Sequence, residues 1–121
     1  MAKAERFLAD AEEAFRGESW DTCVSRCYYA VFHLVAAALA DRGGIEQPRW
    51  DHKQLHREFL GRFCKLGRFF SVADGKTLQR LRELREAADY QRISLTKRQV
   101  DRTLASAQDL CAKIRQVMED G

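Results

Sequence analysis

The 121-residue sequence predicts an all-α fold, an antiparallel up-and-down bundle of four or five helices. Apolar residues recur at spacings of three and four along most of the chain, which is the helical period. No run alternates apolar and polar residues as a half-buried strand would. Short segments containing glycine, serine or the single proline separate the helical runs. We therefore expect one domain, residues 1–121.

The longest apolar-periodic run, residues 19–42, predicts the central helix. Ser19 is its expected N-cap, and the glycine pair at 43–44 is expected to end it. One face should be core, and its residues are Trp20, Val24, Cys27, Val31, Leu34 and Ala38. The opposite face carries Arg26, Tyr29 and His33 among alanines. Polar side chains on such an apolar face need partners, or they line a site.

Two further helices flank this run. The first is amphipathic, with Phe7 and Phe15 on its apolar face, and should end at Gly17. After the central helix, Asp51 is a suitable N-cap for a helix that we expect to continue to about Leu66.

The last part of the chain predicts two more helices. We expect a turn over residues 71–75 and then a highly charged helix that ends near Tyr90. Thr96 and Gln99 have the spacing of a capping box, and a regular apolar stripe from Val100 onward predicts the final helix.

Composition narrows the functional classes. With 21 basic and 18 acidic residues the net charge is +3, which by itself does not indicate nucleic-acid binding, so any basic patch must be local. No uninterrupted apolar run reaches the roughly 18 residues of a membrane span, and the N-terminal segment lacks the residue order of a signal peptide. We expect a cytoplasmic protein without a membrane partner.

Cysteine and histidine spacing gives little support for metal. All four cysteines fall at apolar helical positions, which predicts reduced core thiols: Cys23, Cys27, Cys64 and Cys111. His52 and His56 stand one turn apart, but the segment offers no clear third ligand. A polar helix start, with His52 hydrogen-bonded across the bundle, is the simpler interpretation. We expect neither metal nor cofactor.

Three motifs along the chain, taken together, are a more specific signal than any one of them alone. They are Arg26-Cys27-Tyr28-Tyr29-Ala30-Val31-Phe32-His33, then His52-Lys53, then Arg85-Glu86-Ala87-Ala88-Asp89-Tyr90. Their order and spacing resemble the pattern R-x-YYA-x-F-H, H-K and R-x-x-ADY of small stand-alone HEPN-domain proteins, over nearly the whole chain. The resemblance implies a helical bundle, usually a symmetric dimer. Such proteins are often encoded beside a minimal nucleotidyltransferase as a toxin and antitoxin pair.

Many HEPN proteins are metal-independent ribonucleases with an R-x4-6-H motif contributed by both subunits. The resemblance places Arg85 at the catalytic arginine, but Tyr90 stands where histidine is expected. A tyrosine, with an ordinary pKa of about 10, is a poor acid or base near neutral pH. Arg26 and His33 match R-x6-H, although on a different helix. The catalytic candidates are therefore Arg85, Tyr90, Arg26 and His33, and the substrate-binding candidates are Tyr29, His52, Lys53 and Asp89.

Two functions stay open at this point. One is an RNA-cleaving, or RNA- or nucleotide-binding, component of a toxin-antitoxin-like system that acts with a nucleotidyltransferase partner. The other is a non-catalytic helical binding or adaptor module for that transferase. We also expect Arg26, Tyr29 and His33 to contact the 85–90 segment, with Asp89 as the anionic partner; if exposed, Arg85 and Asp89 form only a surface ion pair. A homodimer is expected from the alanine-rich central helix and the phenylalanine-rich third helix.

Overall fold

The computed structural model describes residues 2–65, 69–90 and 94–120. Within these residues it has five α-helices and no strand, which confirms the all-α prediction. The helices are α1 (Ala2–Arg16), α2 (Trp20–Asp41), α3 (His52–Phe59), α4 (Val72–Asp89) and α5 (Lys97–Glu119). A single π-helical turn, η1 (Leu60–Cys64), continues α3.

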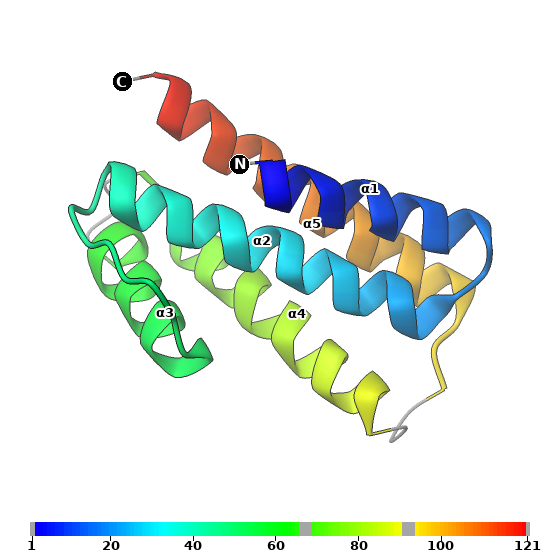
Figure 1. Cartoon of the computed structure of the whole chain (residues 1–121). Coiled ribbons are helices and arrows are strands. Elements are labelled where there is room, and N and C mark those ends of the chain that lie inside the picture. Colours follow the sequence, from blue (N-terminus) through cyan, green and yellow to red (C-terminus); the bar gives the residue numbers. More distant parts are fainter. Residues whose placement is uncertain (1, 66–68, 91–93, 121) are drawn as a thin grey trace.

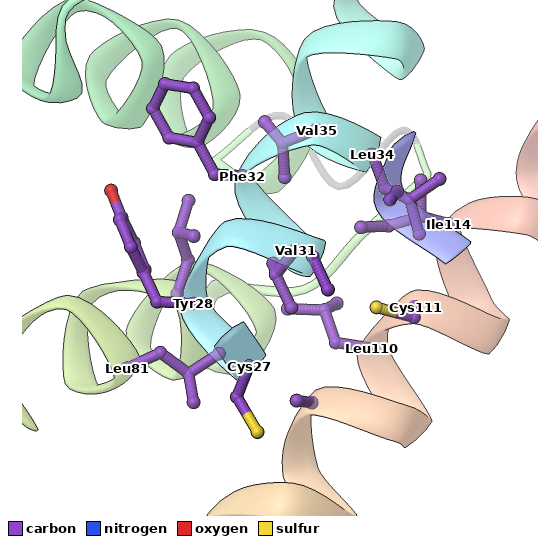
Figure 2. Packing of buried hydrophobic residues seen from close by; sticks show 14 of the residues in the cluster. Cys27, Tyr28, Val31, Phe32, Leu34, Val35, Leu81, Leu110, Cys111 and Ile114 are labelled. Atoms are coloured by element: carbon purple, nitrogen blue, oxygen red, sulfur yellow. The ribbon is translucent and has the colours of Figure 1, made fainter. Parts of the chain in front are cut away.

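Helix α2 lies at the centre of the bundle. Figure 1 shows it between α1 and α5 on one side and α4 on the other, with the four long helices alternating in direction and the short α3 packed near one end. The predicted core stripe is confirmed, since Val24, Cys27, Val31 and Leu34 have no exposed surface. In Figure 2 several of these side chains face α5, whereas Tyr28 points away from it.

Helix α2 is also long and apolar enough to cross a membrane by length and composition, with a mean hydropathy of 1.4 over its most apolar window. However, 56% of that window is buried inside the bundle, and the core helices of soluble proteins pass the same test. The hydropathy of α2 is therefore accounted for by its central place in the core.

The helix starts test the capping predictions. Asp51 caps α3, because its carboxylate accepts hydrogen bonds from the backbone N–H groups of Lys53 and Gln54 at 2.7 and 3.2 Å. Thr96 and Gln99 form the predicted capping box of α5. Ser19 occupies the N-cap position of α2, but its side chain makes no capping hydrogen bond.

The predicted turn at residues 71–75 is wrong. Ser71 and Asp74 form a reciprocal capping box, so α4 already begins at Val72 and contains Gly75. A Cβ atom on Gly75 would lie 2.8 Å from Leu60 Cδ1, so glycine lets α4 approach η1 closely. The expected extension of the third helix is replaced by η1, and its predicted end at Leu66 lies outside the described residues.

The four cysteines and three phenylalanines in and after the third helix belong to the core of the chain. All four cysteines are buried and free, as the sequence predicts, and burial raises the pKa of Cys64 and Cys111 to about 11. Phe59, Phe63 and Phe70 pack on one another with ring centroids 5.1–6.2 Å apart. They are buried within the chain, so they are not available as an apolar dimer surface.

Candidate functional site

Tyr28 of α2 connects the core to the start of α3. Its side chain has no exposed surface, yet its hydroxyl lies 2.7 Å from Nδ1 of His52 and 3.0 Å from Nε2 of His56. The two histidines are four residues apart on α3, so they share the face that packs against α2. The prediction that His52 is hydrogen-bonded across the bundle is confirmed.

Arg85 of α4 packs against the same tyrosine. Its Cζ lies 5.6 Å from the ring centroid of Tyr28 and 5.2 Å from that of Tyr29. Its Nη1 donates a hydrogen bond of 2.8 Å to the Tyr29 hydroxyl. We call Tyr28, Tyr29, His52, His56 and Arg85 the Tyr28 cluster; it combines residues of α2, α3 and α4.

Burial controls the protonation of the cluster. It lowers the pKa of His52, and it lowers that of His56 to about 4, with the positive charge of Arg82 adding to the effect in both. Burial also raises the pKa of Tyr28 well above its ordinary value, although Arg82 and Arg85 oppose the shift. At neutral pH the two imidazoles are therefore uncharged, and the Tyr28 hydroxyl keeps its proton.

An open groove of about 420 Å³ lies beside the cluster, between α3 and α4. Its lining residues are Lys53, His56, Gln79, Arg82, Glu83 and Glu86. Arg82 and Glu86 form an ion pair of 2.9 Å. Positive and negative side chains are balanced in this groove, so its charge alone does not select an anionic ligand.

The structure brings together only part of the predicted site. Tyr29, His52 and Arg85 belong to the Tyr28 cluster, and Lys53 lines the neighbouring groove. His33 lies nearby, because its ring approaches that of Tyr29 at 6.5 Å. The ring of His33 is stacked on Phe7 at 5.3 Å, and burial lowers its pKa.

Arg26 lies elsewhere. It lines a groove between α1 and α2 together with Asp10 and Glu13. No hydrogen bond or ion pair joins Arg26 to Arg85 or Asp89 in the described part of the chain, so the expected pairing of Arg26 with Asp89 is wrong. The cause is the direction in which Arg26 faces, since its side chain lines the groove on the α1 side of α2.

Asp89 and Tyr90 lie at the exposed end of α4. The Asp89 carboxylate is 3.3 Å from Arg85 Nη1, but the side chain is 44% exposed. The pair is therefore of the weak surface type, and Asp89 is not the buried partner that was expected. Tyr90 follows the last helical residue and is 71% exposed.

The sequence interpretation missed the roles of His56 and Arg82. The spacing of His56 from His52 is the available signal, since it places both rings on the face of α3 that meets Tyr28. In the described residues no three His, Cys, Asp or Glu side chains gather as a metal would require. Arg82 lies one helical turn before Arg85, on the same side of α4, and this spacing was the signal for its place beside the cluster.

The fold and the cluster define a small helical-bundle protein whose polar site is built where the first turn of α3 meets α2 and α4. The chain matches the family model described as the HEPN domain over residues 1–117. It is also similar to a UPF0332 protein of Archaeoglobus fulgidus, with 32% identity over 92 residues that make up 74% of this chain and 68% of that protein. The chain belongs to the HEPN domain family.

Proposed function

We propose that this HEPN protein is the RNA-binding component of a cytoplasmic toxin-antitoxin-like pair, acts with a nucleotidyltransferase partner, and holds an RNA phosphate at the Tyr28 cluster. One observation carries the proposal: two side-chain nitrogens of the cluster, on residues that are only partly buried, have no hydrogen-bond partner among the described residues. Neither Nε2 of His52 nor Nη2 of Arg85 has a hydrogen-bond partner in the described residues. Neither is among the buried side-chain nitrogens without a partner.

These two groups suit a phosphate. A guanidinium provides charge and several donors in a fixed plane, and an imidazole nitrogen adds a directional hydrogen bond. Both side chains pack on the ring of Tyr28, which holds them in place without ligand. Little side-chain entropy would then be lost when an anion binds.

Metal-independent RNA cleavage is the second candidate. It is favoured by the presence of an arginine and a neutral imidazole in one cluster, since cleavage needs a cation for the phosphate and a base for the 2'-hydroxyl. Tyr90 at the family's histidine position argues against it. If neither RNA binding nor RNA cleavage is found, the remaining interpretation is a helical adaptor for the transferase.

The test is the affinity of the purified protein for a fluorescent single-stranded RNA, compared with His52→Ala and Arg85→Ala. Each variant should weaken binding by about 10-fold, because each removes one phosphate contact. Arg102→Ala is the control, since it removes an exposed arginine of α5 outside the cluster. Equal losses in all three variants, or no binding by the wild type, would remove the proposal. RNA cleavage that persists with excess chelator would favour the second candidate.

The homodimer and the transferase partner are proposals as well. Because Phe59 and Phe63 are buried within the chain, the dimer proposal now rests on the partly exposed alanines of α2 (Ala36, Ala37 and Ala40) and on the family relationship. Sedimentation of the purified chain at micromolar concentration tests the dimer. Co-expression with a nucleotidyltransferase encoded next to this chain, followed by co-purification, tests the partner.

A further inference from the structure

The hydroxyl of Tyr28 restricts the proton positions on both histidines. A hydroxyl has one proton, so it can donate to only one of the two nitrogens that it approaches. The other nitrogen must then carry a proton and donate to the Tyr28 oxygen. Two arrangements satisfy this condition, and they leave the opposite nitrogen of His52 either bare or protonated.

The distances favour one of the two arrangements. The contact of 2.7 Å to His52 Nδ1 is the shorter and suits a hydroxyl donor, whereas the contact of 3.0 Å to His56 Nε2 is typical of an N–H donor. We infer that Tyr28 donates to Nδ1 of His52, that His56 donates through Nε2–H to Tyr28, and that neutral His52 presents Nε2–H as a phosphate-binding donor.

The surroundings favour the neutral forms that this arrangement needs. Arg82 and Arg85 of α4 face His52, opposed by Glu86 of α4 and Asp51 of the α3 N-cap. Arg82, Glu86 and the ring of His52 face His56. The rings of Tyr28 and Tyr29 cover the α2 side. Burial and Arg82 oppose an imidazolium at both histidines, and Arg85 adds to this at His52, so both stay neutral near pH 7.

The assignment changes the role of His52. With its proton on Nε2, the nitrogen of His52 that has no partner among the described residues has no lone pair in the ring plane, so it cannot accept the proton of a 2'-hydroxyl. It can donate to a phosphate oxygen beside Arg85. Tyr28 and His56 are then positioning residues that fix the tautomer of His52. The choice of phosphate as ligand rests on the proposed function, whereas the tautomer does not.

The tautomers can be measured without RNA by long-range proton-nitrogen NMR of the wild-type protein with labelled imidazoles near pH 7. We expect protonated Nε2 and bare Nδ1 in both His52 and His56. A proton on Nδ1 of His52 would overturn the assignment. Tyr28→Phe should raise the pKa of His52, because the lost hydrogen bond favours the neutral form, and an unchanged pKa would also overturn it.

The donor role is tested by two substitutions of one residue. His52→Gln keeps an N–H group near the position of Nε2, whereas His52→Ala removes it. We expect the RNA affinity of His52→Gln to stay within about 3-fold of wild type and that of His52→Ala to fall about 10-fold. Equal losses would overturn the donor role. If the wild-type protein binds no RNA, the proposed function fails. The tautomer assignment is then still decided by the NMR measurement alone.

Discussion

The hydrogen bond of 2.7 Å between Tyr28 and His52 joins two motifs that are 24 residues apart in the sequence. Tyr28 fills the core with its ring and reaches the site with its hydroxyl. The bond therefore couples the packing of α2 to the orientation of an imidazole on α3. A substitution at Tyr28 should affect both stability and the site.

Tyr28→Phe should lower the free energy of unfolding by roughly 1–3 kcal/mol, because two partly buried imidazoles lose their shared partner. Tyr29→Phe is the matched control, since it removes one hydroxyl whose partner Arg85 keeps a second contact, with Asp89. Its loss should be about 1 kcal/mol or less. Chemical denaturation near pH 7 measures both, and a larger loss for Tyr29→Phe would contradict this ranking.

Acid should destabilise the protein before carboxylate titration begins. His56 has a pKa of about 4 in the folded chain, against about 6.5 when unfolded, so between these values the unfolded state binds more protons. Stability is then full above about pH 6.5 and falls as the pH approaches 4. Burial lowers the pKa values of His52 and His33 as well, so both residues add to this loss of stability in acid.

His56→Gln isolates the largest part of this dependence. A neutral amide does not titrate, so the variant should lose less stability than wild type between about pH 6.5 and pH 4.5, by about 2 kcal/mol. Denaturation curves at several pH values provide the comparison. Parallel profiles for the two proteins would mean that His56 titrates normally in the folded state.

Asp89→Ala should change the free energy of unfolding by less than about 1 kcal/mol, because the carboxylate is half-exposed and forms one ion pair. Arg85→Ala should cost more, since that side chain is 17% exposed, packs on two tyrosine rings and donates to Tyr29. Melting temperatures of both variants decide the order. A severe loss for Asp89→Ala would show that its carboxylate has a structural role beyond the surface pair.

Local sequence patterns are sufficient to predict most of the fold. The stripe on α2 repeats at the helical period, and the Asp51 and Thr96 caps depend only on residues within one turn. The start of α4 was missed because Gly75 suggested a turn. The reciprocal bonds of Ser71 and Asp74, which determine the helix start, have the same local character but use aspartate where glutamate is usual.

The site was harder to predict because its contacts are not local. That Arg26 and His33 share a face of α2 was read correctly, but each faces a different part of α1. The pairing of His56 with Tyr28 depends on the angle at which α3 crosses α2, which spacing within α3 cannot reveal. The resemblance identified His52 and Arg85 as candidates, and only the packing of three helices places them on one tyrosine ring.

Arg85→Lys tests whether the phosphate contact needs the planar guanidinium group or only its positive charge. The guanidinium donates to Tyr29 through Nη1, and Nη2 has no partner among the described residues, so the side chain can hold its position and bind an anion at the same time. A lysine ammonium is a single point and cannot fill both positions. RNA affinity of Arg85→Lys should therefore fall by about as much as that of Arg85→Ala, roughly 10-fold. Arg102→Lys, on the surface of α5, should bind as wild type does. Full affinity in Arg85→Lys would mean that charge alone attracts the RNA and that the alignment by Tyr29 is not required.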